Sequence, residues 1–362
     1  MPKRIGKYTL EIENDVRILN NAAIVGHKEA EGPLAKYFDK TYSDDKFGES
    51  SWEKAESFLQ KSAVELALKK ADIDAPSINY IFAGDLLNQC ISSTFGLRAL
   101  GIPFLGQYGA CSTMAQTISM ASVFADSFAA DRCVAVTSSH FCSAERQFRF
   151  PLEYGGQRTP TAQWTVTGSG AAIIQRGGSG VKIKRITIGR ITDMGIKDAN
   201  NMGAAMAPAA CDTIVQHFED FKTKPSDYDK IITGDLSQIG SKLLIDLLRE
   251  KKIDISDRHM DCGLEIFKRK EQDVHAGGSG CGCSAVILAS YILPQIQKKI
   301  WKRVLFVPTG ALLSKISFNE GASIPGIAHA VVIEALDSFD ERFEKKQKAM
   351  SLAEGGKSCR NI

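Results

Sequence analysis

The chain has 362 residues, of which 44% are hydrophobic, and a formal net charge of +3 at pH 7. This size allows a large core with two similar lobes, and the balanced charge excludes a protein that binds nucleic acid through a strongly basic surface. The nine cysteines lack the spacing of small secreted domains and no signal peptide precedes them, so we expect reduced thiols in the cytosol.

The first long element along the chain is a helix over residues 52–73. Ser50 and Glu53 have the spacing of a capping box before it, and apolar side chains then recur every three or four residues. This pattern predicts a helix with one buried face. Apolar runs that predict short strands follow at residues 78–85, 133–140 and 168–176.

Cys111 lies in the stretch GQYGACSTMAQTISMA, residues 106–121, between a glycine-rich approach and a helix-like run. The small residues before it allow a tight turn, and apolar residues after it recur at helical spacing as far as Phe128. The pattern predicts a strand-to-helix turn with Ser112 and Thr113 as cap residues. Unpaired amides and the helix dipole lower the pKa of a thiol at such a turn, which favours a functional cysteine over an apolar filler.

The organisation of the first half of the chain returns in the second half. Residues 79–89 resemble residues 229–239, and the glycine-rich turn with its helix returns at residues 275–290. Two copies of one α/β unit explain this repeat. We therefore predict a first half over residues 1–180, which carries Cys111, a second half over residues 181–340, and an exposed helical tail over residues 341–362.

This duplicated α/β unit, with a cysteine at the start of the central helix of its first copy, resembles the thiolase and β-ketoacyl synthase superfamily. Within it, an ordered set of segments resembles a family of sporulation proteins from spore-forming Firmicutes. These segments are GDLLNQ, GQYGACSTMAQ, ERQFRFPLEYGGQRTPTAQWTVTGSGA, NMGAAMAPAA, DVHAGGSGCGCSA and SIPGIAHA. The resemblance implies a five-layer α-β-α-β-α fold with two pseudo-symmetric halves and central helices that start near Cys111 and Gly280. It also implies a homodimer in which edge strands around residues 133–139 pair across a two-fold axis.

Condensing enzymes of this superfamily need a cysteine nucleophile and two neutral side chains, histidine with asparagine or two histidines, that stabilise an enolate. By the internal repeat and the resemblance, the histidine belongs in the turn around Asp235 and the asparagine in the turn 278–281. Neither residue is present there. A carboxylate at Asp235 also repels a developing enolate. We therefore expect a non-catalytic member of the superfamily and assign no catalytic residue.

The ligand that the resemblance implies is dipicolinic acid (pyridine-2,6-dicarboxylic acid), alone or as its calcium chelate, with no other cofactor and no metal site of the protein. Backbone amides near Cys111 and in the turn 309–311 would form a relic oxyanion hole, which binds a carboxylate. Asp85 would be protonated, bridge through calcium, or accept a bond from a protonated ring nitrogen. The residues predicted to bind the ligand are Asp85, Cys111, Ser112, His140, Gly280 and Gly310.

The longest apolar stretch, residues 285–293, is too short to span a bilayer, so uptake of the ligand into the forespore requires integral membrane proteins as partners. We expect the chain to attach peripherally to the inner forespore membrane. Two alternatives stay open at this point. The chain is an active acyltransferase or condensing enzyme that uses Cys111, with His275 as its histidine, or it is a scaffold for membrane partners with a closed and empty cavity.

Overall fold

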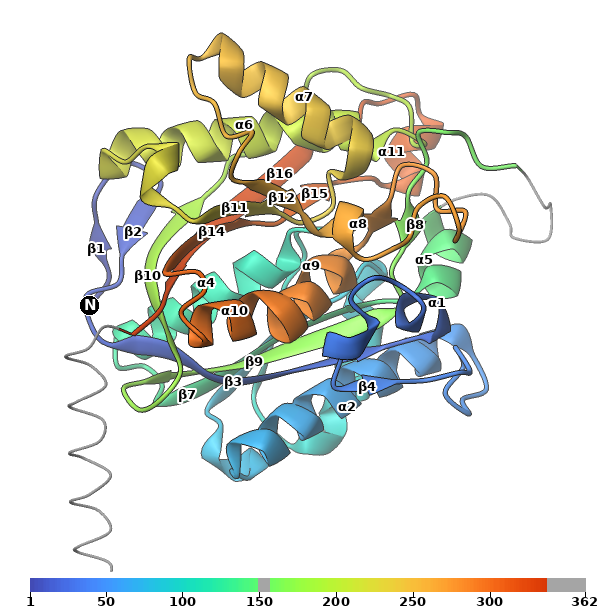
Figure 1. Cartoon of the computed structure of the whole chain (residues 1–362). Helices are drawn as coiled ribbons and strands as arrows, with labels where there is room; N and C mark the ends of the chain where they lie inside the picture. Colours follow the sequence, from blue (N-terminus) through green and yellow to red (C-terminus); the bar gives the residue numbers. More distant parts are fainter. Residues whose placement is uncertain (149–156, 337–362) are drawn as a thin grey trace, which may run out of the picture.

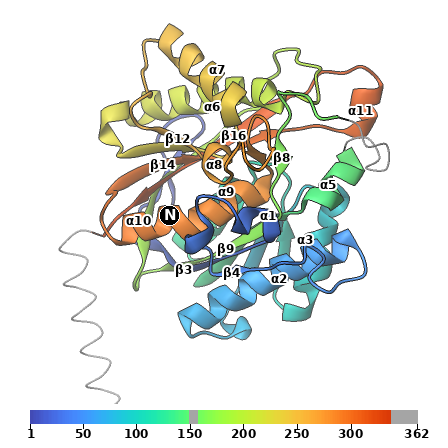
Figure 2. The same cartoon turned by 45° about the vertical axis from the view of Figure 1, so that its right-hand side comes forward.

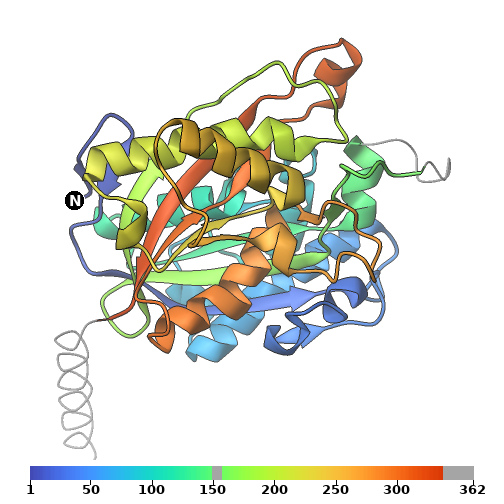
Figure 3. The ribbon, with the colours of Figure 1, turned by 45° about the horizontal axis from the view of Figure 1, so that its top comes forward.

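Two buried helices form the centre of the molecule, which the computed structural model describes for residues 1–148 and 157–336 (Figure 1). These helices, α4 (Thr113–Asp126) and α9 (Cys281–Ile287), lie between two groups of strands. The layers are therefore arranged as α-β-α-β-α, which confirms the predicted fold class. The outer layers are α2 (Trp52–Ala71) with α3 (Ile91–Leu97) on one side (Figure 2), and α6 (Met202–Phe221) with α7 (Ser237–Glu250) on the other (Figure 3).

The two groups of strands have the same order and the same directions. The first group is β3-β9-β7-β5-β6 and the second is β10-β16-β14-β11-β12. In each group the last three strands are parallel to one another. The second strand is antiparallel to both of its neighbours, the first and the third. The predicted internal repeat is thus present in the strand pairing. The bounds are, in these orders, Val16–Val25, Gly168–Arg176, Arg132–Ser139, Tyr80–Gly84 and Phe104–Gly106, then Val181–Ile188, Gly326–Glu334, Arg303–Val307, Lys230–Thr233 and His259–Asp261.

The groups are joined where β10 pairs with β3, through Val181 opposite Ile18 and Lys182 opposite Arg17. The first group is built from residues before 180 and the second from residues after it. The predicted tail at 341–362 lies outside the described residues. The shorter elements are β1 (Lys3–Arg4), β2 (Thr9–Glu11), α1 (His27–Ala30), β4 (Lys40–Thr41), α5 (Phe141–Phe148), β8 (Trp164–Thr165), α8 (Cys262–Glu265), β13 (Gly278–Ser279), α10 (Leu293–Gln297), β15 (Thr309–Ala311) and α11 (Lys315–Asn319).

Glycines let the central helix α9 lie directly on strand β9. A Cβ atom on Gly282 would lie 2.5 Å from the carbonyl oxygen of Gly168, and one on Gly170 would lie 2.3 Å from the carbonyl oxygen of Ala285. Both distances are shorter than a van der Waals contact, so a side chain at either position would push the helix away from the strand. All residues of α9 are buried as a result.

The predicted apolar face of the helix after Cys111 is confirmed for Met114, Ile118, Ala121 and Ala125, which are all fully buried. The extension of this face to Phe128 is wrong. Helix α4 ends at Asp126, and the side chain of Phe128 is 63% exposed beyond it.

None of the helices within residues 1–148 and 157–336 combines the length and the apolar character that crossing a membrane requires.

Two sequence-based details need correction. Helix α2 is capped by Ser51 and not by Ser50, because the Ser51 hydroxyl accepts a hydrogen bond from the Lys54 amide (3.3 Å) while Ser50 meets the Lys54 ammonium. The strand at 133–139 is also not an edge strand, since β7 pairs with β9 on one side and β5 on the other. The edge of the first group is β6, whose residues are exposed.

Because an N-cap serine satisfies a free amide at the helix start, we expect Ser51→Ala to lower the free energy of unfolding by about 1 kcal/mol. Ser50→Ala is the matched control and should change it by less than about 0.5 kcal/mol. Urea unfolding followed by far-UV circular dichroism measures both. Equal losses in the two variants would contradict the assigned cap.

Candidate functional site

A small cavity lies beside Cys111, with walls from both halves of the chain. Its volume is about 40 Å³. Helix α5 supplies three of its wall residues, and most of the other walls are apolar. The lining residues are Leu86, Tyr108, Ala110, Cys111, Ala144, Glu145, Phe148, Thr165, Met202, Ser279, Ala311 and Leu313.

The Cys111 thiol meets the two turns in which the sequence predicts the counterparts of catalytic residues. Its sulfur lies 4.0 Å from the Ser279 hydroxyl, which donates to a carboxylate oxygen of Asp235 at 3.1 Å. The Gly280 amide donates to the same oxygen (2.9 Å), and the Thr309 hydroxyl donates to the other oxygen (3.0 Å). The turns around residues 235 and 279 therefore converge on Cys111. They carry the carboxyl group of Asp235 and the hydroxyl group of Ser279, where a condensing enzyme needs histidine and asparagine.

The environment of the Cys111 thiol opposes its ionisation. Burial raises the pKa of this thiol well above its ordinary value, and the neighbouring Asp235 raises it further. The amides of Ser112 and Thr113 are already paired, with the carbonyls of Gly109 (3.0 Å) and Ala110 (3.3 Å). The prediction of unpaired amides and a lowered thiol pKa is therefore wrong, because the tight turn uses those donors internally.

A second buried carboxyl group, that of Asp261 at the end of β12, binds the turn that carries Asp235. Burial raises the pKa of Asp235 to about 6 and that of Asp261 to about 7, although both accept several hydrogen bonds. Asp261 accepts the amides of Leu236 and Ser237, both at 2.9 Å, at the start of α7. This arrangement leaves the oxygens of Asp235 for Ser279, Gly280 and Thr309.

Of the six residues predicted to bind a ligand, Cys111 alone lines the cavity. Asp85 does not reach it, because its carboxylate accepts hydrogen bonds from the Leu87 amide (2.9 Å) and from the amide (2.8 Å) and hydroxyl (2.6 Å) of Ser93. The Asp85 side chain is fully buried and holds the loop after β5. A substitution at this position therefore tests the fold and not a contact with the ligand.

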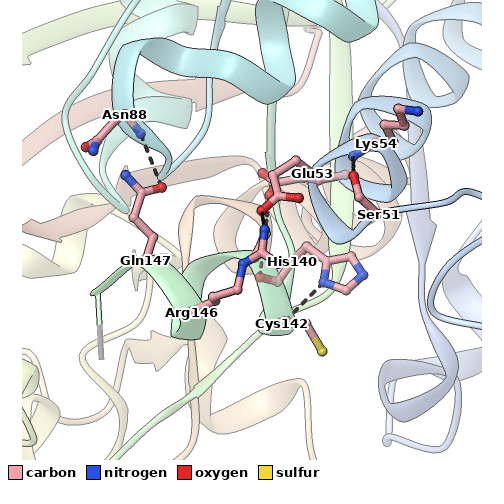
Figure 4. A network of polar contacts seen from close by, with 10 residues as sticks. Ser51, Glu53, Lys54, Asn88, His140, Cys142, Arg146 and Gln147 are labelled. Carbon is pink, nitrogen blue, oxygen red and sulfur yellow. Dashed lines mark hydrogen bonds and ion pairs between the residues drawn. The ribbon is translucent and has the colours of Figure 1, made fainter. Parts of the chain in front are cut away.

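His140 also lies away from the cavity, on the side of α5 that faces α2 (Figure 4). One ring nitrogen is 2.7 Å from the Asp45 carbonyl oxygen, and the other accepts the Cys142 amide at 3.1 Å. The ring packs near those of Phe47 and Trp52. Burial lowers the pKa of His140, so this side chain is a neutral part of the core.

Ser112, Gly280 and Gly310 shape the turn of Cys111 without lining the cavity. The Ser112 hydroxyl donates to the Gly109 carbonyl at 2.7 Å. A Cβ atom on Gly310 would lie 2.3 Å from that same carbonyl oxygen and 3.2 Å from the Cys111 nitrogen. Gly280 has a φ of +103° and its amide binds Asp235, so a side chain there would be strained.

Helix α5 is held in place by polar contacts on the side away from the cavity (Figure 4). Arg146 pairs with Glu53 of α2, and the Gln147 side chain accepts the Asn88 amide at 3.4 Å. These contacts position the cavity residues Ala144, two residues before Arg146, and Phe148, directly after Gln147. Within the described residues, no cluster of three or more histidine, cysteine or acidic side chains has the arrangement of a metal site.

Several wall residues were not predicted, although some had a usable signal. Tyr108 lies within the cysteine motif itself, and Ala311 belongs to the turn 309–311, whose amides are expected in the relic oxyanion hole. Met202 and Phe148 lie in two of the segments that carry the family resemblance, but neither is near Cys111 in the sequence. Only the fold brings them to the cavity.

Comparison with known proteins gives concordant matches. The family model described as stage V sporulation protein AD matches residues 6–334. Stage V sporulation protein AD of Bacillus subtilis is 46% identical over 332 residues, which cover 92% of this chain and 98% of that protein. Among solved structures, 3-oxoacyl-[acyl-carrier-protein] synthase III from Aquifex aeolicus has a TM-score of 0.52 at 12% identity, and the match covers 88% of this chain and 99% of that one. An OleA variant from Xanthomonas campestris has a TM-score of 0.57 at 13% identity, with 90% and 99% covered. These distant structures share the fold.

The raised pKa of Asp235 makes a prediction about stability. Because its folded-state pKa is about 6, above the ordinary 3.8, its contribution to stability is complete below the ordinary pKa and is lost as the pH rises through about 6. Protonation of Asp235 should therefore stabilise the parent as the pH falls from about 8 to about 5. In Asp235→Asn we expect the change in unfolding free energy over this range to be less favourable by about 1 kcal/mol. Urea unfolding at both pH values measures this.

Asp246→Asn, on the exposed side of α7, is the matched control for the exchange of a carboxyl for an amide. An Asp235→Asn variant that keeps the full pH dependence of the parent would show that Asp235 does not titrate in this range.

Proposed function

The chain belongs to the stage V sporulation protein AD family, and from this premise we propose that it binds dipicolinic acid, alone or as its calcium chelate, without chemical turnover. Family membership supports a role in sporulation. The cavity beside Cys111 is the proposed binding site. In this proposal the bound acid is delivered for uptake into the forespore.

The observation that carries the non-catalytic assignment is the burial of the Cys111 thiol next to Ser279, which donates to Asp235. Burial, and then the nearby Asp235, raise the pKa of this thiol, and a protonated thiol is a poor nucleophile. Within the described residues no histidine lines the cavity, so no imidazole is placed there to stabilise an enolate.

The cavity walls suit a flat ring with polar groups at its edge. Apolar side chains such as Leu86 and Leu313 can cover the ring faces, while the Tyr108 hydroxyl can donate to a carboxylate oxygen. Dipicolinic acid is larger than the cavity of about 40 Å³, so binding in this proposal requires wall side chains to move. Met202 has a long and unbranched side chain and is the wall residue that adapts most easily.

The proposal predicts a specific ranking of variants. Cys111→Ala should weaken dipicolinate binding by only about fivefold, because it removes one small buried group. Cys111→Trp should abolish binding by filling the cavity. Cys142→Trp, at a partly exposed cysteine outside the cavity, is the matched control and should bind like the parent. Calorimetric titration with dipicolinate, with and without calcium, measures all three.

The enzymatic alternative predicts different results. An active acyltransferase would show a covalent mass shift with acetyl- or malonyl-coenzyme A that disappears in Cys111→Ala. That adduct together with turnover would overturn the non-catalytic proposal. A scaffold with a closed cavity would bind none of the acids tested.

Transport of the acid requires further proteins in this proposal. No helix within the described residues is able to span a membrane. We therefore propose integral membrane proteins as partners, with the chain attached peripherally at the inner forespore membrane.

We also propose that the chain forms a homodimer through strand β6. This edge strand has unpaired backbone groups on one side, and Phe104 and Leu105 are 37% and 40% exposed. Further exposed apolar side chains lie on the neighbouring α3, α4 and cysteine turn. They are Ile91, Phe95, Tyr108 and Met120. If two copies of the chain paired through their β6 strands with two-fold symmetry, each would cover the unpaired backbone groups and the exposed apolar side chains of the other.

A charge at the centre of this edge should prevent the pairing. We expect Leu105→Glu to sediment as a monomer at concentrations at which the parent is a dimer. Ile316→Glu, at an exposed isoleucine on α11, is the matched control and should remain dimeric. A parent that stays monomeric as its concentration is raised, or a dimeric Leu105→Glu variant, would contradict the proposal.

A further inference from the structure

Three aromatic side chains form a row that includes Trp301, just after the end of α10. The rings of Tyr37 and Tyr291 have centroids 5.1 Å apart, and those of Tyr291 and Trp301 are 5.7 Å apart. All three side chains are partly buried and pack against the core from outside. Such rings have an apolar body and a polar edge, which suits the boundary between water and an apolar phase.

Lysines lie beside this row in space or in the sequence. The Lys36 ammonium lies 5.1 Å from the centroid of the Tyr37 ring. Lys298 and Lys302 are exposed on the two sides of Trp301 along the chain, and within residues 1–148 and 157–336 neither forms an ion pair. We call the surface formed by Lys36, Tyr37, Tyr291, Lys298, Ile300, Trp301 and Lys302 the Trp301 face.

The turn that carries this face is fixed by hydrogen bonds. The amides of Ile300 (3.0 Å) and Trp301 (3.3 Å) both donate to the Gln295 carbonyl, and Lys299 has a left-handed φ of +59°. This is a closed helix C-terminus of the Schellman kind. The side chain of Ile300 is 61% exposed on it, so this apolar group is held outward by a rigid backbone.

The acidic groups beneath the turn are engaged in other contacts. Glu334 pairs with Arg303 at 2.6 Å, and the Asp229 carboxylate accepts the backbone amides of Lys302 (2.6 Å) and Arg303 (2.9 Å). Glu265 lies beside the aromatic row. Burial, Tyr37 and then Glu265 raise the pKa of Tyr291. The Trp301 face therefore combines exposed positive charge with an outward apolar tip.

We propose that the Trp301 face binds directly to the surface of a lipid bilayer that contains anionic lipids. Lysines close to such a surface are attracted to the headgroups, and tryptophan and tyrosine rings settle at headgroup depth. Ile300 then reaches the acyl boundary, as apolar side chains of interfacial segments do. The positive charge favours an anionic lipid surface over the apolar surface of a protein. This contact rests on the peripheral attachment in the proposed function and is independent of ligand binding, because no residue of this face lines the cavity.

The test uses the purified full chain and two kinds of protein-free vesicles, phosphatidylcholine alone and phosphatidylcholine mixed with phosphatidylglycerol. In co-sedimentation, the chain should bind the mixed vesicles, bind phosphatidylcholine poorly, and lose affinity as salt is added. The double variant Lys298→Glu and Lys302→Glu should bind the mixed vesicles about twentyfold more weakly or worse. Ile300→Ser should bind severalfold more weakly with an unchanged salt dependence.

The matched control is the double variant Lys251→Glu and Lys252→Glu. These exposed lysines also follow a helix end, with Lys252 in a left-handed conformation, but they lie at the end of α7. The control should bind like the parent, and dipicolinate titration of all variants separates a lipid defect from a ligand defect. No binding to mixed vesicles, equal binding to both vesicles, or an equal loss in the control overturns the proposal. Binding to protein-bearing membranes alone also overturns it, and assigns the face to a protein partner.

Discussion

The site depends on a carboxyl group buried between the two halves of the chain. Asp235 accepts hydrogen bonds from Ser279 and Gly280 at the start of the second central helix and from Thr309 on β15. The same group faces the thiol at the start of the first central helix. Burying a carboxyl group costs free energy, and its hydrogen bonds offset that cost only while every partner stays in place. The geometry that orders the cavity thus also opposes the ionisation of the Cys111 thiol.

The internal repeat explains how Asp235 became available for this role. In the first half, Asp85 follows strand β5 and binds the amide and hydroxyl groups of its own loop. In the second half, Asp235 follows the equivalent strand β11, but Asp261 binds the amides of that loop. Asp261 is the last residue of β12, the counterpart of β6, which ends in Gly106. A carboxylate at the end of β12 therefore leaves the oxygens of Asp235 for Ser279, Gly280 and Thr309.

The strands, the repeat and the Cys111 turn could be predicted because they depend on local patterns of apolar and small residues. The strand at 168–176 ends where the sequence indicates, since Arg176 and the glycines after it stop the apolar run. The direction of a side chain in a loop has no such pattern. Asp85 and His140 both follow a strand of the correct sheet, yet their partners Ser93 and Asp45 turn them away from the cavity. Strand order is equally non-local, so no local pattern in the sequence identifies β6 and not β7 as the edge.

The burial of α4 and α9 between the halves has a consequence for how the chain folds. During synthesis the first half emerges with one side of α4 bare, because α9 and β16, which pack against it, come from the last quarter of the chain. Contacts between residues so far apart in sequence form slowly, and an apolar helix left uncovered meanwhile attracts other chains. Despite their common pattern, the halves therefore should not fold separately. Chaperones have the greatest opportunity to act on this protein in the interval before α9 leaves the ribosome.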